Sequence, residues 1–412
     1  MAHVHVIGAG LAGLSTALAL TRVGRSVTIY ESGPQAGGRC RSYFDRELGC
    51  RIDNGNHLLL SGNTAAFAYL DRIGASHTMG GPGEPFFPFM DVRTGERWTL
   101  RPGKGRLPWW IFSPSRRVPG TTPREYLSLL RLKRSEPTAT VAVALHRGPL
   151  YTKLIEPLAI AALNTPPEEG SARLLARVVA ETLMRGGGAC VPAFPRVGLS
   201  ESLIDPALAY LRNKGAAILF GHRITALRNA EGCATSLETA NGSVAVDPGA
   251  HVILAAPPWI ASALLPNLTV PTEFEAILNI HFRVDADPDR AGFIGLVSGT
   301  AEWVFVKPGH VSVTISAANR LVDQPAENLA AAVWPNVCSA LRLSGPMPPW
   351  RVVKEKRATF RATPAQDRLR PPCRTSLRNV LLAGDWTATG LPGTIEGAIR
   401  SGQTAAEAIL AA

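Results

Sequence analysis

The stretch His3-Val-His-Val-Ile-Gly-Ala-Gly-Leu-Ala-Gly13 decides the fold of this 412-residue chain. Its first five residues are typical of a short buried strand, and its glycines have the spacing Gly-x-Gly-x-x-Gly. Apolar residues recur at helical spacing over 14–20, and a second apolar strand, 26–30, ends at Glu31. A strand, a glycine turn, a helix, a strand and a terminal acid together predict a dinucleotide-binding unit.

At each of these three positions a physical requirement favours glycine. Gly8 permits the tight turn, Gly10 lets a pyrophosphate approach the backbone, and Gly13 lets the helix pack closely on the strands. The start of the helix, including Leu11 and Ala12, offers free N–H groups and a partial positive charge to phosphates. We therefore predict that these five residues bind a dinucleotide.

Glu31 lies 18 residues after the third glycine. A carboxylate there accepts hydrogen bonds from both hydroxyls of an adenosine ribose, which favours FAD or NAD over NADP. We include the adjacent Ser32 in the predicted site.

The next segment, Gly37-Gly38-Arg39-Cys40-Arg41, places two arginines within reach of the same pyrophosphate. It resembles the Gly-Gly-Arg segment that follows the second strand in the superfamily of flavin-containing amine oxidases and phytoene desaturases. The resemblance implies that the dinucleotide is FAD, bound in part by Gly38, Arg39 and Arg41.

The carboxyl-terminal end resembles the closing flavin motif of the same superfamily. A buried strand, 379–383, leads to Gly384 and Asp385, and a glycine-bearing loop precedes a helix that begins near Thr394. The resemblance implies that Asp385 binds the ribityl chain of FAD. It also implies that N–H groups around Ile395 and Glu396 face the pyrimidine edge of the flavin, where a helix start stabilises negative charge.

The chain between these ends predicts a discontinuous cofactor domain. Short apolar stretches between 216 and 256 indicate strands, and in the superfamily such a block contacts adenine, here near Ile224. We predict an α/β fold with a Rossmann-like FAD-binding domain built around a parallel sheet. It comprises residues 1–75, 196–262 and 372–412, and an α+β substrate domain comprises 76–195 and 263–371.

Three further stretches resemble the hydroxysqualene dehydroxylases: 53–60, 154–169 and 194–200. The resemblance covers nearly the whole chain and is weakest over 265–350. It implies reductive dehydroxylation of hydroxysqualene to squalene, in which reduced flavin delivers hydride to an allylic carbocation. A plainer role remains open for some of these residues, since Asn164 could cap a helix that Pro166 and Pro167 end.

The segment from Asp53 to His57 should pass beside the flavin, so we include Gly55, Asn56 and His57 in the cofactor site. His57 is the candidate general acid because imidazole titrates near neutrality. A purely structural hydrogen-bonding role is the alternative, and Asp53 is expected to be structural. No second nucleotide fingerprint is present, so a reduced nicotinamide or a reductase would supply electrons by transient contact.

Other functions have to be weighed. A carotenoid-type desaturase or isomerase, or an amine oxidase, would share the cofactor motifs. The closing segment 387–394 offers no Tyr for the aromatic cage of an amine oxidase. A lipid-binding protein without flavin, like the Rab GDP-dissociation inhibitors, is disfavoured by the intact glycine turn, Arg39 and Asp385.

Composition sets further limits. Hydrophobic residues make up 46% and charged residues 18%, which indicates a large globular core and excludes disorder. The six cysteines are scattered without a Cys-x-x-Cys pair, so we expect no metal site and a reducing, cytoplasmic compartment. The apolar run 4–20 carries glycines and lacks the basic start of a signal peptide, and no membrane span is expected.

The net charge of +11 is concentrated between residues 97 and 134. This window holds ten basic residues and one acid, Glu125, together with Trp109-Trp-Ile-Phe112 between two prolines. We predict that it is an exposed loop that docks on the cytoplasmic face of a membrane, where aromatic rings and basic side chains favour the interface. Nucleic-acid binding is not expected, because no recognition helix or aromatic sheet pattern accompanies the charge.

Overall fold

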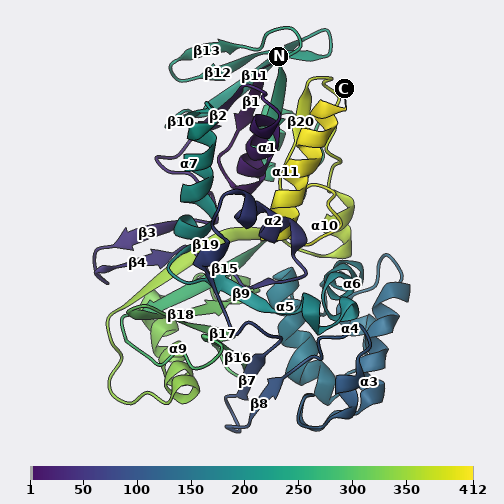
Figure 1. Ribbon diagram of the computed structural model, residues 1–412, viewed down its shortest axis with the longest axis vertical. Helices are drawn as coiled ribbons and strands as arrows, with labels where there is room; N and C mark the ends of the chain where they lie inside the picture. Colours follow the sequence, from purple (N-terminus) through teal and green to yellow (C-terminus); the bar gives the residue numbers. More distant parts are fainter. Residues whose placement is uncertain (1–2, 412) are drawn as a thin grey trace.

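The computed structural model describes residues 3–411. Its upper half in Figure 1 is organised around a parallel sheet of five strands in the order β10-β2-β1-β14-β20. The strands are β1 (Val4–Ile7), β2 (Val27–Glu31), β10 (Ala217–Phe220), β14 (His251–Leu254) and β20 (Val380–Leu382). Every pairing within the sheet is parallel. The predicted α/β class is therefore confirmed, whereas the division at particular residues remains a prediction.

Helices α1 (Leu11–Arg22) and α11 (Ile395–Leu410) pack side by side beside this sheet, as Figure 1 shows. A Cβ placed on Gly402 would lie 2.3 Å from the carbonyl oxygen of Ala12, so only glycine permits this approach. The Ser15 hydroxyl donates to the Ile399 carbonyl oxygen at 2.9 Å. The first and last helices of the chain are thereby joined directly.

Smaller elements complete this half. Three antiparallel strands, β11, β12 and β13, form a separate sheet at its top. Other elements here are α2 (Thr64–Arg72), η1 (Ser76–Thr78), η7 (Ser200–Ile204), α7 (Asp205–Asn213), β11 (Ile224–Ala230), β12 (Cys233–Thr239), β13 (Gly242–Ala245), α8 (Pro258–Leu264) and α10 (Pro364–Arg368). The strands predicted between residues 216 and 256 are thus present as β10, β11, β12 and β14.

The lower half contains a seven-stranded mixed sheet in the order β19-β15-β18-β17-β16-β7-β8. The strands are β7 (Phe87–Asp91), β8 (Arg97–Leu100), β15 (Phe274–Phe282), β16 (Phe293–Val297), β17 (Trp303–Lys307), β18 (His310–Ile315) and β19 (Trp350–Phe360). Alternation along β15 places Leu278, Ile280 and Phe282 on the face covered by α9 (Ala326–Leu341). The opposite face of β15 carries Asn279 and His281, both buried.

Short strands connect the two halves. The hairpin of β3 (Ser42–Asp45) and β4 (Cys50–Asp53) leads into β5 (Leu59–Leu60). Strand β9 (Pro192–Pro195) pairs with both β5 and β6 (Met79–Gly80). The segment 53–60 therefore lies between the hairpin and β9, where it can contact both halves.

A helical region between residues 101 and 190 flanks the mixed sheet at the lower right of Figure 1. It comprises η2 (Trp109–Phe112), α3 (Pro123–Leu127), η3 (Ser128–Arg134), α4 (Val141–Ala144), η4 (Tyr151–Ile155), α5 (Glu156–Leu163), α6 (Ala172–Glu181), η5 (Leu183–Arg185) and η6 (Gly187–Ala189). The loop predicted over 97–134 therefore contains strand β8 and several helical turns. The predicted exposure of its aromatic cluster is only half right. Trp109 and Phe112 are 70% and 60% exposed, but Trp110 is 9% exposed because its ring packs edge-on against Tyr126.

Asn164 ties this helical region to the mixed sheet. It ends α5 in the left-handed conformation, with φ of 48°. Its amide nitrogen donates to Thr359 Oγ1 at 3.0 Å, and its amide oxygen accepts the N–H of Ala317 at 2.7 Å. Asn164 therefore caps the helix, and it also links three distant segments.

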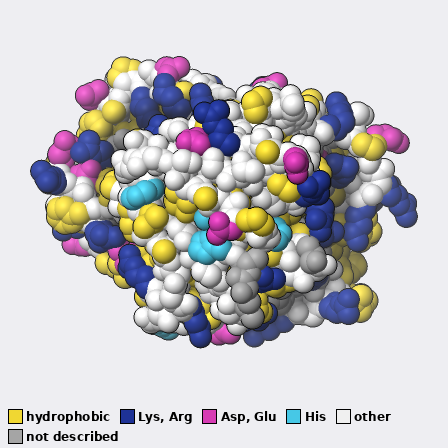
Figure 2. All heavy atoms as spheres, turned by 90° about the horizontal axis from the view of Figure 1, so that it is seen from above, with side chains coloured by type: hydrophobic (Ala, Val, Ile, Leu, Met, Phe, Trp, Pro, Cys, Tyr) yellow, Lys and Arg dark blue, Asp and Glu magenta, His cyan; other side chains and the backbone are white. Residues whose placement is uncertain are grey.

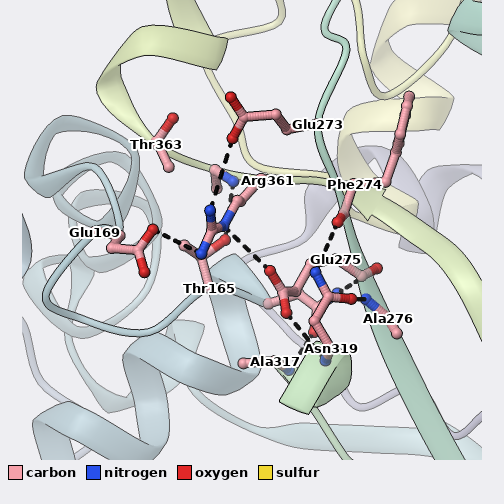
Figure 3. A network of polar contacts seen from close by, with 12 residues as sticks. Thr165, Glu169, Glu273, Phe274, Glu275, Ala276, Ala317, Asn319, Arg361 and Thr363 are labelled. Carbon is pink, nitrogen blue, oxygen red and sulfur yellow. Dashed lines mark hydrogen bonds and ion pairs between the residues drawn. The ribbon is translucent and has the colours of Figure 1, made fainter. Parts of the chain in front are cut away.

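A cluster of ion pairs reinforces this junction. Figure 3 shows Arg361 among three carboxylates. Its guanidinium nitrogens lie 2.7 Å from Glu169, 3.3 Å from Glu275 and 3.7 Å from Glu273. The distinctive stretch 154–169 thus positions the helical region against the sheet.

Candidate cofactor and substrate site

The glycine turn has two packed glycines and one open glycine. Gly8 has φ of 108°, and a Cβ on it would lie 2.7 Å from the carbonyl oxygen of Ala255. A Cβ on Gly13 would lie 2.0 Å from the carbonyl oxygen of Gly8. A Cβ on Gly10, by contrast, has no atom within 4 Å. Gly8 and Gly13 are therefore required by the fold, whereas Gly10 borders free space.

This space adjoins the start of α1. Gly10 is the N-cap and has no side chain to satisfy the first N–H groups, among them those of Leu11 and Ala12. The second glycine segment lies directly against the turn: Gly37 donates its N–H to the Ala9 carbonyl oxygen at 2.9 Å, and Gly38 lies next to Gly10. Free helix N–H groups beside an open glycine suit a diphosphate.

The predicted adenosine end is assembled around Glu31, at the end of β2. Its carboxylate accepts the N–H of Ala9 at 2.9 Å and the N–H of Gly33 at 2.8 Å, and the Ser32 hydroxyl lies 3.3 Å away. The N–H of His222 donates to the Glu31 carbonyl oxygen, and β11 begins two residues later at Ile224, which is buried. Three separate segments thus bring Glu31, Ser32 and Ile224 to one region.

Arg39 and Asp385 meet although they are 346 residues apart. Arg39 donates to Asp385 Oδ1 at 2.6 Å and to the Ala358 carbonyl oxygen at 2.6 Å. Burial opposes the charge of Arg39, but the neighbouring carboxylate of Asp385 raises the pKa of the guanidinium. Arg41 is turned differently, donating to the Gly38 carbonyl oxygen at 2.8 Å. A cavity beside the ion pair is lined by Arg39, Pro257, Pro258, Trp259, Phe274, Arg357, Thr359, Phe360, Asp385 and Trp386.

The closing motif presents a second helix start. The Thr394 hydroxyl accepts the N–H of Gly397 at 3.0 Å and caps α11, while the N–H groups of Ile395 and Glu396 have no acceptor within the helix. The N–H of Gly384 donates to Ser401 Oγ at 2.8 Å, which fixes the turn before Asp385. The Glu396 carboxylate accepts the N–H groups of Ala65 and Ala66 at the start of α2, a role that the sequence did not reveal.

Asp53 has the structural role expected for it. It is buried, accepts the Ser42 hydroxyl at 2.6 Å and the Leu199 N–H at 2.9 Å, and forms an ion pair with Lys307 of β17. Burial alone would raise the pKa of this carboxyl, but Lys307 and the hydrogen bonds outweigh it and lower the pKa. A charged pair inside the protein therefore joins the hairpin to the mixed sheet.

Gly55 and Asn56 lie on the polar face of that sheet. The Asn56 amide nitrogen donates to Ser312 Oγ at 2.7 Å and to Thr314 Oγ1 at 3.0 Å. Asn279 donates to the Asn54 carbonyl oxygen at 3.1 Å, and a Cβ on Gly55 would lie 3.2 Å from the Asn279 amide nitrogen. The loop 53–58 is thus held by polar contacts to β15 and β18.

His57 lies in this loop with its Nε2 atom 3.9 Å from Cys40 Sγ. Burial lowers the pKa of its imidazole to about 4; Asp53 opposes this shift, whereas Arg39 and Lys307 add to it. His57 is therefore neutral at pH 7, so it holds no excess proton before substrate binds. Its role as general acid remains a prediction. In that role a neutral imidazole would have to relay the proton.

Several buried polar residues near the loop were missed by sequence reasoning. They lie on β15, β17 and β18: Asn279, His281, Lys307 and His310. Both ring nitrogens of His281 and Nε2 of His310 lack a hydrogen-bond partner within the described residues. The available signal was the alternation of polar residues with apolar ones along β15, which is unusual for a strand buried on both faces.

Comparisons with known proteins agree with this geometry. The sequence pattern of the family described as flavin containing amine oxidoreductase matches residues 11–285 and 294–410. The chain therefore belongs to this family, and the FAD cofactor predicted from the sequence is confirmed, as is the assignment as an FAD-dependent oxidoreductase. The open glycine turn, the two free helix starts and the Arg39–Asp385 pair fit the diphosphate and ribityl groups of FAD.

The chain is similar over nearly its whole length to hydroxysqualene dehydroxylases. It is 48% identical to that of Rhodopseudomonas palustris and 46% identical to that of Sinorhizobium fredii, each match covering 99% of this chain and 98% of the relative. In fold, it is similar to cyclohexylamine oxidase from Brevibacterium oxydans, with a TM-score of 0.69 and 18% identity over 99% of this chain and 98% of that one.

The open space at Gly10 predicts that Gly10→Val folds but fails to bind FAD. Gly10 has extended backbone dihedrals that valine tolerates, and no atom obstructs its Cβ, so the side chain would occupy the diphosphate space. FAD affinity should fall by about tenfold or more. Flavin absorbance of the purified protein and far-ultraviolet circular dichroism measure occupancy and folding separately. Gly13→Val is the contrast, since it should fail to fold, and full FAD occupancy of Gly10→Val would show that the motif assignment is wrong.

The lowered pKa values of three histidines lead us to predict a loss of stability in mild acid. Burial lowers the pKa of His57 and His310 to about 4 and that of His281 to about 3, below the ordinary value of 6.5. The unfolded chain therefore binds more protons below pH 6.5, and the free energy of unfolding falls as the pH drops from 6.5 towards 4. Each histidine can contribute up to about 2 kcal/mol of this loss at pH 5.

Urea unfolding at pH 7 and pH 5 tests this effect. His310→Gln should lose less stability between the two pH values than the wild type, whatever its stability at pH 7. The exposed His77→Gln should behave like the wild type. An equal loss in His310→Gln and the wild type would contradict the prediction.

Proposed function

We propose that this enzyme reduces hydroxysqualene to squalene. The observation that carries the proposal is the near-complete alignment with hydroxysqualene dehydroxylases at 48% and 46% identity. The reaction breaks one C–O bond and forms one C–H bond. A proton joins the leaving hydroxyl to give water, and bound reduced FAD supplies hydride and is oxidised.

The protein has to supply a dry apolar site, a held substrate and a proton for the leaving oxygen. The loop 53–58 supports the requirements for an apolar site and a held substrate. Asn56 fixes the loop on the mixed sheet, and Leu58 packs against a buried group of phenylalanines. His57 lies between them and is our candidate for transferring the proton to the leaving hydroxyl.

We further propose that a reduced nicotinamide or a reductase recharges the flavin by transient contact. The sequence contains one dinucleotide fingerprint, at Gly8 to Gly13, which the FAD assignment already uses. An electron donor would therefore act without a second Rossmann-type site on this chain.

We propose that the helical region docks on the cytoplasmic face of a membrane to collect its polyprenyl alcohol. The support is a surface that we call the docking face. Six of the eleven exposed large hydrophobic side chains among residues 3–411 belong to it: Leu107, Trp109, Phe112, Leu127, Leu130 and Val143. Their elements adjoin one another, since α3 packs against η2 and η3, and α4 against η3.

Exposed basic side chains alternate with these apolar ones along the same segments of the chain. Arg106, Arg116, Arg124, Arg131, Lys133 and Arg134 are all exposed. Each cation near an anionic surface adds about 1 kcal/mol of attraction. The far end of the molecule differs: the view from above in Figure 2 shows basic, acidic and hydrophobic side chains mixed, with histidines near the centre. No helix in the described chain is long and apolar enough to cross a membrane.

The reaction is tested by reducing the bound flavin without oxygen and adding hydroxysqualene. The expected result is flavin reoxidation with formation of one squalene per flavin. A carotenoid-type desaturase would instead require oxidised flavin and form a new double bond, and an amine oxidase would reduce its flavin with an amine. Hydroxysqualene that leaves the reduced flavin unchanged would contradict the proposal.

Docking is tested by co-sedimentation with phosphatidylglycerol vesicles. The wild type should pellet at low salt and less at high salt, because screening weakens surface charge attraction. Trp109→Ala/Phe112→Ala should remain in the supernatant with its FAD bound. The control is Phe44→Ala, since Phe44 is 59% exposed but lies in the β3–β4 hairpin. Equal sedimentation of the two variants would argue against the docking face.

A further inference from the structure

The face of the mixed sheet that carries the loop 53–58 changes character across its strands. In one row, Phe293 of β16 pairs with Phe305 of β17, which pairs with Ser312 of β18, which pairs with His281 of β15. In the next row Trp303 of β17 pairs with Thr314. Trp303 and Phe305 of β17 thus adjoin polar residues of β18, and Lys307, which is paired with Asp53, follows on the same face of β17.

The polar residues of β18 lie next to the loop 53–58. Asn56 donates to both Ser312 and Thr314. Neighbouring strands are about 4.8 Å apart, so Phe305 and Trp303 lie one strand spacing from residues that this loop contacts. Leu58 of the same loop packs against the aromatic group.

The aromatic group consists of closely placed rings. The ring centroid of Phe194, from β9, lies 6.1 Å from that of Phe293 and 5.7 Å from that of Phe305, and the last two are 6.0 Å apart. Trp303 lies 6.1 Å from Phe293. The faces of these rings carry partial negative charge, so they attract a cation.

Phe86, a further ring of this hydrophobic cluster, lies beside two cationic side chains. The guanidinium carbons of Arg101 and Arg290 each lie 5.0 Å from the ring centroid of Phe86. Phe86 packs with Phe194, Phe293 and Phe305 in the same buried cluster. Positive charge is therefore stabilised at Phe86 by the attraction between a cation and an aromatic face.

We propose that Phe194, Phe293, Trp303 and Phe305 form the subsite that holds the positive charge of the reacting substrate. This inference rests on the proposed function, in which loss of the hydroxyl leaves a cation spread over an allylic group. A carboxylate beside such a cation would form a bond to it, and water would add to it. Aromatic faces stabilise the charge without either reaction, so the cation persists until hydride arrives.

Binding of a stable cation tests this subsite without turnover. The probes are dimethylfarnesylammonium and the uncharged hydrocarbon in which carbon replaces its nitrogen. The wild-type holoenzyme should bind the ammonium ion about tenfold more tightly than the hydrocarbon. Phe293→Leu and Phe305→Leu should lose most of this preference and keep their affinity for the hydrocarbon, since leucine preserves an apolar surface.

Two further sets of variants make the test specific. Phe282→Leu is the matched control, because Phe282 lies in the same sheet on the opposite face, and it should keep the preference. Replacing Phe293 by phenylalanines with one, two and three ring fluorines keeps the ring while weakening its negative face. The preference should then fall stepwise with each fluorine.

Failure of this inference is distinguishable from failure of the proposed function. Equal binding of the two probes by the wild type would overturn the subsite, as would a preference that survives in both leucine variants or is insensitive to fluorination. Squalene formation by the wild-type enzyme is measured separately. If squalene forms while the preference is absent, the reaction stands and the aromatic subsite is wrong.

Discussion

The contact between α1 and α11 is the constraint on which the cofactor site depends. Gly402 lacks a side chain where a Cβ would lie 2.3 Å from the Ala12 carbonyl oxygen, so the last helix lies directly on the first. This brings Asp385 and the start of α11 to the glycine turn, although nearly the whole chain separates them in sequence. A packing requirement in the core thus helps to assemble a site from two ends of the protein, where Arg39 and Asp385 form an ion pair.

A second junction places the substrate side of the site. The loop 53–58 is held on the mixed sheet by Asn56 and by the buried pair of Asp53 with Lys307. Transferring these charges from water is costly, and the pair is accommodated because Ser42 and the Leu199 N–H satisfy the remaining carboxylate oxygen. The loop consequently occupies one defined position between the cofactor half and the sheet.

The two faces of the mixed sheet have separate tasks. One face packs against α9 through apolar side chains and stabilises the fold. The other combines polar residues under the loop 53–58 with aromatic residues beside it. The solved cyclohexylamine oxidase shares this architecture at only 18% identity, so differences in chemistry within the fold have to arise from the side chains on such a face.

The sequence by itself determined the features whose signal is local. The spacing of Gly8, Gly10 and Gly13, the acid at Glu31 and the strand before Asp385 were sufficient for the fold class and a dinucleotide site, because each reflects the geometry of one turn, strand or helix start. The choice of FAD came from the resemblance of the segment 37–41 to the flavin superfamily. Only the tertiary structure decided which distant segments meet. Residue periodicity reports the side of an element on which a residue lies, but not what covers that side. For this reason neither the Asp53–Lys307 pair, nor the burial of Trp110 beside the exposed Trp109, nor the aromatic group assembled from β9, β16 and β17 could be read from the chain.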